Sequence, residues 1–256
     1  MTVTLLGLFA GILVGMTGTG GGALLTPLLL LFTPYPALVV IGTDLVAGVA
    51  TKLVGFVEHW KLGRIYWRLA GYIILGSLPG SVAGIAFILL LKAHLSAAHL
   101  EAGLKGFVGV ALFAASISLP YVRKKKMGAS GNMGLPTRFS PLGFMMAGAA
   151  VGFLVAVTSV GSGSLIMVFM LVAAPIPITE LVGTDVMLGL ATTVLAGTLH
   201  LWMGHFDGRL FAGLVMGSVP GVIAGSWFSH HIPERYLSWI LSLLYFSLGA
   251  RLLLSW

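Results

Sequence analysis

Two Gly-Thr-Asp triplets carry the clearest candidates for chemistry in this sequence. They place Thr43-Asp44 and Thr184-Asp185 inside long apolar stretches, where the desolvation of an ionisable side chain is costly and therefore indicates a function. The threonines would donate hydrogen bonds to a substrate, and the aspartates would relay a coupling proton or hold a broken helix in place. In the alternative interpretation, Thr or Asp of each triplet caps a helix that restarts directly after it.

Two glycine clusters form the second candidate. Residues 18–22 read Gly-Thr-Gly-Gly-Gly and residues 161–164 read Gly-Ser-Gly-Ser, and each cluster precedes an apolar helical run. Unpaired N–H groups at a helix N-terminus attract an anion, and glycine lets a ligand approach the backbone closely. Tight helix packing is the alternative, because small residues also recur at four-residue spacing. The predicted substrate-binding residues are Thr17, Gly20, Gly21, Gly22, Thr43, Asp44, Thr158, Gly161, Ser162, Gly163, Ser164, Thr184 and Asp185.

Two histidines, each followed four residues later by glycine, stand near the ends of apolar stretches. His59 and His200, together with Asp44 and Asp185, are the predicted proton-relay residues, because an ordinary histidine has a pKa of about 6.5. A position at the membrane interface is the alternative for both histidines. The chain has no cysteine and no spacing typical of metal ligands, so we expect neither a metal nor a cofactor.

Known catalytic and nucleotide-binding motifs are absent from the sequence. There is no nucleophile elbow, no zinc-protease motif and no phosphate-binding loop of the ATPase type. We therefore predict that the chain is not an enzyme and that it has no catalytic residues.

The composition requires lipid as the outer solvent. Of the 256 residues, 58% are hydrophobic and only 8% are charged, and the mean hydropathy is +1.05. A soluble domain has about 25% charged residues. The net charge of +7 does not indicate nucleic acid, because the basic residues lie in short loops between apolar stretches, where they orient a membrane protein.

The apolar stretches define the membrane segments. They cover residues 2–33, 37–60, 67–91, 98–120, 139–174, 178–201, 207–229 and 235–254. A single span needs about 20 residues. The first and fifth stretches are too long for one span and too short for two, and each contains a glycine cluster. Either each crosses once, giving eight crossings and parallel halves, or each forms a re-entrant hairpin, giving inverted halves. The lengths favour the hairpins slightly.

An internal duplication explains the recurrence of these motifs. A shift of 141 positions aligns residues 11–87 with 152–228 without a gap and gives 27 identities in 77 pairs. Glycines, prolines, histidines and aspartates coincide at this single offset. The predicted domains are a first transmembrane repeat at 1–120, a basic cytoplasmic linker at 121–138 and a second transmembrane repeat at 139–256.

The order of these motifs resembles the sulfite exporter TauE/SafE family of membrane permeases. The similar segments are Gly-Thr-Gly-Gly-Gly-Ala-Leu-Leu-Thr-Pro at 18–27, the Gly-Thr-Asp triplets, the His-x3-Gly pairs, and Gly-Ser-x-Pro-Gly-x2-Ala-Gly at 76–84 and 217–225. The resemblance covers nearly the whole chain. It implies transport of a small sulfur-containing anion such as sulfite, a sulfonate or sulfoacetate, with energy from an ion gradient and not from ATP.

Two features depart from the family pattern. Ser162 and Ser164 stand where the first half has Gly21 and Ala23, so the two half-sites are not equivalent. Both halves also have Asp after Gly-Thr, where the family often has Ser or Asn.

The sequence thus predicts an all-α integral membrane protein with about eight transmembrane segments in two homologous halves, and glycine-broken or re-entrant helices in each half. The expected function is secondary transport of sulfite or an organosulfonate across the cell (inner) membrane, with a passive anion channel as the alternative. A membrane enzyme or an accessory subunit is a weaker alternative. The expected partners are a small anionic substrate and membrane lipid, without nucleic acid, and the oligomeric state, homo-oligomers included, stays open.

Overall fold

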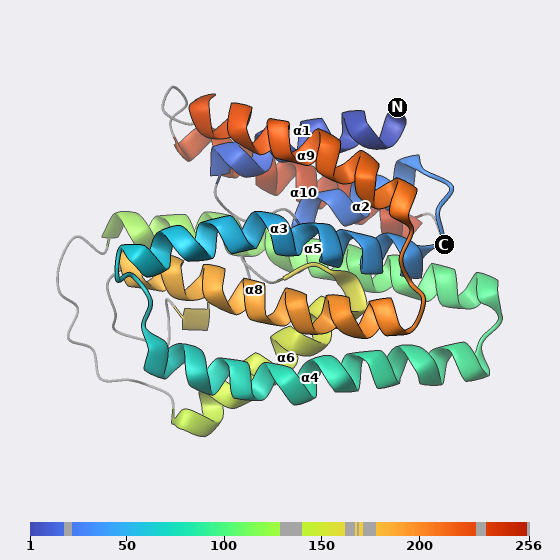
Figure 1. The fold of residues 1–256 in the computed structure, drawn as a ribbon, viewed down its shortest axis with the longest axis horizontal. Helices are drawn as coiled ribbons and strands as arrows, with labels where there is room; N and C mark the ends of the chain where they lie inside the picture. Colours follow the sequence, from blue (N-terminus) through green and yellow to red (C-terminus); the bar gives the residue numbers. More distant parts are fainter. Residues whose placement is uncertain are drawn as a thin grey trace.

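The computed structural model describes residues 1–17, 22–128, 140–161, 167, 169, 170, 178–228 and 234–254. Within these ranges the secondary structure is helical, as predicted, and contains no strand (Figure 1). The described helices are α1 (Thr2–Thr17), α2 (Gly22–Phe32), α3 (Ala37–Lys61), α4 (Trp67–His94), α5 (Ala97–Gly128), α6 (Pro141–Thr158), α8 (Ile178–Trp202), α9 (Gly208–Phe228) and α10 (Glu234–Leu254).

Both over-long apolar stretches break at their glycine clusters. In the first, α1 ends at Thr17 and α2 begins at Gly22. In the second, α6 ends at Thr158, where Ser159 adopts a left-handed conformation with φ of 60° and Gly161 has φ of 110°. Since L side chains rarely adopt such angles, glycine at 161 allows the chain to turn here.

Six of the described helices are long and apolar enough to cross a membrane. They are α3, α4, α5, α6, α8 and α9, whereas α1 and α10 contribute shorter apolar helices. Sixteen helical residues, the length of α1, rise only about 24 Å, less than the hydrocarbon core of about 30 Å. The predicted membrane segments are thus present as helices, and eight full crossings stay a prediction. The last helix of the first half, α5, continues to Gly128, inside the predicted linker.

Helices α1 and α9 pack side by side through glycines (Figure 1). A Cβ added to Gly11 would lie 2.5 Å from the carbonyl oxygen of Ser218, and one added to Gly15 would lie 2.2 Å from that of Val222. Only residues without a side chain allow backbones to approach this closely. The contacted residue numbers rise together along both helices, so α1 and α9 run parallel.

Helices α4 and α6 repeat this contact at the 141-residue offset. A Cβ on Gly148 would lie 2.1 Å from the carbonyl oxygen of Ile73, and one on Gly152 would lie 2.3 Å from that of Ser77. These positions correspond to Gly7 with Leu214 and to Gly11 with Ser218 in the other pair. Each of the two tight pairs therefore takes one helix from each half of the chain.

Helices α3 and α8 lie between the two tight pairs, since α3 also contacts α9 and α8 also contacts α4 (Figure 1). A Cβ on Gly48 would lie 3.6 Å from Thr193, and one on Gly55 would lie 3.3 Å from Val186. Residue numbers rise along α3 as they fall along α8, so this central pair is antiparallel. The α3 and α8 backbones therefore lie farther apart at these glycines than the backbones of the outer pairs, where an added Cβ would clash with backbone atoms.

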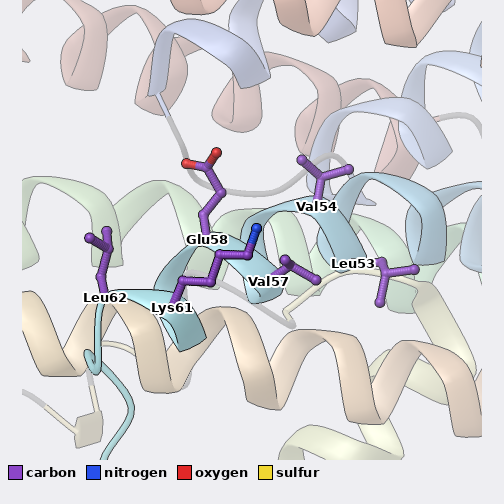
Figure 2. Close-up of a pocket in the computed structure, with 6 residues that line it drawn as sticks. All are labelled: Leu53, Val54, Val57, Glu58, Lys61 and Leu62. Carbon is purple, nitrogen blue, oxygen red and sulfur yellow. The ribbon is translucent and has the colours of Figure 1, made fainter.

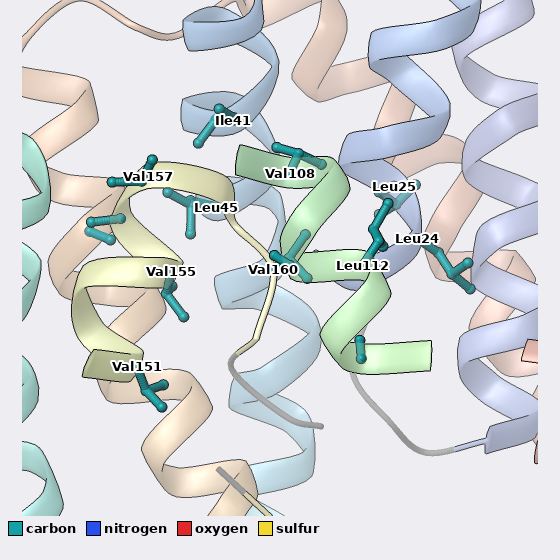
Figure 3. Packing of buried hydrophobic residues seen from close by; sticks show 14 of the residues in the cluster. Leu24, Leu25, Ile41, Leu45, Val108, Leu112, Val151, Val155, Val157 and Val160 are labelled. Carbon is teal, nitrogen blue, oxygen red and sulfur yellow. The ribbon is translucent and has the colours of Figure 1, made fainter. Parts of the chain in front are cut away.

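A buried apolar core surrounds the central pair. Leu45 of α3 lies beside Val157 of α6, and Leu112 of α5 lies beside Leu24 and Leu25 of α2 (Figure 3). Large apolar side chains also cover the outer surface, among them Val82, Met216, Ile223, Trp227 and Leu243. An exterior this apolar is suited to lipid, which agrees with the composition.

Candidate functional site

Four of the predicted polar residues, Asp44, His59, Asp185 and His200, lie on α3 and α8 in line with other polar or small residues. Their positions follow one another at steps of three or four residues, the spacing of one helix face, except that Thr51 precedes Lys52 directly and Thr192 precedes Thr193 directly. We call this set the polar stripe, and it consists of Asp44, Gly48, Thr51, Lys52, Gly55 and His59 in α3 and of Asp185, Gly189, Thr192, Thr193, Ala196 and His200 in α8. The members correspond pairwise at the 141-residue offset, and only two of the six pairs differ in residue type.

Asp44 joins α3 to both broken segments. Its Oδ2 accepts hydrogen bonds from Thr26 Oγ1 at 2.5 Å and from Ser159 Oγ at 2.9 Å. Thr26 belongs to α2, after the first break, and Ser159 follows α6 at the second break. Helix α3 passes Asp44 without interruption, and α8 likewise passes Asp185. The alternative that each triplet caps a restarting helix is therefore wrong.

A narrow cavity lies against Asp44. It is bounded by residues of α1, α2, α3 and α9, which are Gly11, Val14, Leu25, Asp44, Ala47, Gly48, Thr51, Ser218 and Val222. The carboxylate is 1% exposed, and its Oδ1 has no hydrogen-bond partner within the described ranges. An unsatisfied carboxylate oxygen in such a place can receive a proton or a hydrogen-bond donor.

The threonines of the triplets contact backbone. Thr43 Oγ1 accepts the N–H of Asp207 at 3.0 Å, and Thr184 Oγ1 accepts the N–H of Tyr66 at 2.9 Å. The preceding glycines approach the same two loops, since a Cβ on Gly42 would lie 2.0 Å from the carbonyl oxygen of His205. Both hydroxyls are fully buried and hold a helix start of the opposite half. Their contact with a substrate stays a prediction.

Asp185 has different surroundings from Asp44. The positions that correspond to Thr26 and Ser159 carry Met167 and Gly18, which have no hydroxyl to donate. Asp185 is 8% exposed and interacts electrostatically with Lys52. The duplicated aspartates are therefore chemically inequivalent.

Lys52 is a member of the polar stripe that was missed in the sequence analysis. Its Nζ donates to Thr193 Oγ1 at 2.5 Å, and its charge is attracted by both Asp44 and Asp185. A lysine inside a membrane-spanning helix indicates function for the same reason as an aspartate. The signal was available, because Lys52 corresponds to Thr193 at the 141-residue offset and is thus a charge present in one half alone.

The two predicted histidines lie at opposite ends of the antiparallel pair. His200 is fully buried, its Nε2 donates to the carbonyl oxygen of Ala156 at 2.8 Å, and its Nδ1 lies 3.2 Å from Nδ1 of His205. Because a carbonyl cannot donate, neutral His200 carries its proton on Nε2, so His205 donates between the rings. His59 is only partly buried. The predicted relay between the histidines has no direct contact and stays a prediction.

His205 lies in the loop between α8 and α9. Burial, together with the neighbouring His200 and Lys92, lowers the pKa of His205 to about 4. The His205 ring is therefore neutral at pH 7.

Several predicted binding residues fall at the breaks. Gly20, Gly21, Ser162, Gly163 and Ser164 lie outside the described residues, and Thr17 and Gly22 are described in their backbone only. Thr158 Oγ1 donates to the carbonyl oxygen of Leu154 at 2.6 Å and accepts the N–H of Val160, so this hydroxyl shapes the turn that ends α6. The described ranges contain no group of three side chains suited to a metal ion.

A surface hollow on the C-terminal part of α3 lies apart from the polar stripe. Figure 2 shows the side chains that line it, which are Leu53, Val54, Val57, Glu58, Lys61 and Leu62. They belong to a mostly exposed face of α3, and none is a predicted site residue.

Comparison with known proteins decides the family. The model of the family described as Sulfite exporter TauE/SafE matches residues 3–252. The chain belongs to this family. TauE/SafE membership places the chain among membrane transport proteins, not enzymes, and with its apolar helices it makes the chain a multi-pass protein of the cell membrane.

Three relatives from Bacillus subtilis (strain 168) extend the comparison. The chain is 34% identical over 255 residues to the probable membrane transporter protein YjnA, with 99% of each chain covered. It is 25% identical over 238 residues to YdhB, with 93% of each chain covered, and 22% identical over 271 residues to YunE, with 98% of this chain and 96% of YunE covered. YdhB and YunE are likewise probable membrane transporter proteins by name. No solved structure gives a significant match.

Proposed function

We propose that this protein is a secondary transporter that moves a small anion, sulfite or an organosulfonate, across the cell membrane and draws its energy from an ion gradient. The observation that carries the proposal is the polar stripe between α3 and α8. It holds Asp44, Lys52 and Asp185 inside membrane-spanning helices, where ionisable groups mark the paths of substrates and protons. The family description supports the choice of sulfite as the first substrate to test.

The arrangement of the helices supports a pair of inverted repeats, at 1–120 and 139–256, joined by a cytoplasmic linker at 121–138. Helices α3 and α8 occupy corresponding places in the two halves, yet they run antiparallel. Halves of equal orientation would have placed them parallel. Inverted repeats that meet at a central site are typical of secondary transporters.

Differences in packing suggest how the protein alternates between two open states. The pairs α1–α9 and α4–α6 approach through their backbones, whereas a Cβ added to Gly48 or Gly55 in the α3–α8 contact would lie 3.3 Å or more from the other helix. We propose that each tight pair moves as a rigid unit and that the units rock against each other along the α3–α8 contact. The bound anion would then face each side of the membrane in turn.

The glycine-rich breaks are proposed to supply backbone N–H groups to the anion. The hydrogen bonds of Asp44 with Thr26 of α2 and with Ser159 after α6 support this proposal. Replacing Gly22 or Gly163 by Leu should abolish transport while leaving expression intact, because the side chain would block this approach. Transport that survives in both variants would move the site away from the breaks.

The deciding experiment is transport by purified protein in liposomes. The substrate panel contains sulfite, thiosulfate, sulfoacetate, sulfate and a short carboxylate, under imposed proton or sodium gradients. We expect saturable uptake of a sulfur oxyanion that responds to one gradient. A passive anion channel would instead give flux that does not saturate and a current without counter-transport. Absence of flux for every anion would refute the proposal.

A further inference from the structure

We propose that Lys52 binds the transported anion through its ammonium group, at the point where α3 and α8 cross, with help from the hydroxyl of Thr193. This inference rests on the proposed function and names a residue of its substrate site. The class of ligand is a small oxyanion, because an ammonium group beside a hydroxyl offers a positive charge and hydrogen-bond donors without an apolar surface for a larger group.

The position of Lys52 is set by the duplication. Lys52 is residue 16 of the 25 in α3, and Thr193 is residue 16 of the 25 in α8. Helices α3 and α8 are related by the 141-residue offset and run antiparallel, so a two-fold axis relates them. A residue of α3 can contact its own counterpart in α8 only near this axis. The hydrogen bond from Lys52 to Thr193 therefore marks this axis. A group on it lies at equal depth from either side of the membrane, as one site with alternating access requires.

Lys52 is the positively charged member of the polar stripe and lies between its two carboxylates. Asp44 precedes Lys52 by eight residues in α3, and Asp185 precedes Thr193 by eight residues in α8. At 1.5 Å per residue, the two carboxylates lie about 12 Å from the crossing along the helix axes, in opposite directions. Both carboxylates attract the ammonium group electrostatically. The stripe thus offers a positive centre between two negative flanks.

The helices beside Lys52 pack less closely than the outer helix pairs. Gly48 stands one turn before it and Gly55 about one turn after it. A Cβ on either would meet neighbours only at 3.3 to 3.6 Å, whereas the corresponding distances in the outer pairs fall to 1.8 Å at Gly76. Thr193 Oγ1 accepts from Lys52 and keeps its own hydrogen for an oxyanion.

Calorimetric titration of the purified full chain with sulfite and sulfoacetate tests the proposal. Lys52→Gln keeps a donor for Thr193 but removes the charge, and Lys52→Arg keeps the charge. We expect Kd and KM to rise more than about tenfold in Lys52→Gln and to change only a few-fold in Lys52→Arg. The matched control is Lys105→Gln, whose lysine pairs with Glu101 at 3.4 Å on the protein surface and should not affect binding.

The duplication provides a second test. In Lys52→Thr the charge is lost, and adding Thr193→Lys returns it from the other helix. We expect the double variant to regain most of the affinity lost in the single one. If Lys52→Gln does not fold, the wild-type protein is tested instead. Its lysines are carbamylated with cyanate, and the extent of modification is measured by mass spectrometry. Sulfite should then slow modification of Lys52 and not of Lys105.

The outcomes separate this inference from the proposed function. Wild-type protein that transports anions, with equal affinity in Lys52→Gln or with unprotected Lys52, would overturn the role of Lys52 and leave the transporter intact. Wild-type protein that neither binds nor transports any anion would overturn the proposed function, and the anion site with it.

Discussion

Thr43, on α3, holds the backbone N–H of Asp207 at the start of α9, with 3.0 Å between hydroxyl oxygen and nitrogen. The corresponding Thr184 holds Tyr66 at the start of α4 in the same way. Asp207 in turn caps its own helix, since its Oδ1 accepts the N–H of Leu210 at 2.7 Å. Each Gly-Thr-Asp triplet therefore fastens the loop before a helix of the opposite half.

Replacement of either threonine by valine should destabilise the protein. Thr43→Val and Thr184→Val each remove a buried acceptor, and an unsatisfied N–H costs about 1–3 kcal/mol. We expect lower thermal unfolding midpoints in detergent for both variants, with smaller losses for Thr43→Ser and Thr184→Ser. If the valine variants stayed as stable as wild type and lost substrate binding alone, the predicted substrate contact of these hydroxyls would be supported.

The glycines of the tight pairs should tolerate no side chain. Gly76 and Gly71 both lie within α4, but a Cβ on Gly76 would lie 1.8 Å from the carbonyl oxygen of Met145, whereas one on Gly71 meets nothing within 4 Å. We expect Gly76→Ala to lose at least about 2 kcal/mol or to fail to fold. Gly71→Ala should be neutral or gain about 0.5–1 kcal/mol from helix propensity. Thermal unfolding of the pair measures the contrast, and equal stability would refute the close packing.

The two hydroxyls on Asp44 should act together. Thr26→Val and Ser159→Ala each remove a hydrogen bond to a carboxylate, so we expect losses of about 1.5–3 kcal/mol. Their combined effect should depart from the sum, because both bind the same oxygen. Thr198→Val is the control, since the hydroxyl of this exposed residue bonds only to its own helix. Additive losses in a double-mutant cycle would contradict a shared interaction.

Stability should fall in mild acid because of His205. Its pKa is about 4 in the folded protein and about 6.5 when unfolded. Between these values the unfolded state binds more protons, so stability falls as the pH drops from 6.5 towards 4, by at most about 3 kcal/mol. We expect His205→Gln to flatten this dependence in thermal unfolding between pH 7 and pH 4.5. An unchanged pH profile would exclude His205 as its cause.

Hydropathy and glycine content predicted the helices well, because both are local properties of the chain. The stretches at 37–60 and 178–201 became α3 at Ala37–Lys61 and α8 at Ile178–Trp202. Helix partners were harder to predict. Glycines spaced by four residues in α1 indicate a tight contact, but nothing near them in the sequence identifies α9 as the partner.

The site was predicted in part. The aspartates were found because they recur at the 141-residue offset, whereas Lys52 was missed because the second half has Thr193 in its place. Thr43 was interpreted as a substrate ligand because its hydrogen-bond partner could not be foreseen. This partner is the backbone N–H of Asp207, which lies 164 residues away in the sequence. His205 could not be connected to His200 without the turn that brings the two rings together, with centroids 5.2 Å apart.

The exchange of helices between the halves has a consequence for biosynthesis. The ribosome makes α1 first, but the glycine face of α1 finds its partner only when α9 has been made, after most of the chain is already in the membrane. Likewise, the glycine face of α4 stays without its partner until α6 has been made. A nascent first half therefore holds two incomplete surfaces, and membrane quality-control proteases should recognise it. An ancestral protein with a single repeat could have covered the same glycine faces only as a dimer, in which each copy packed its helices against those of the other.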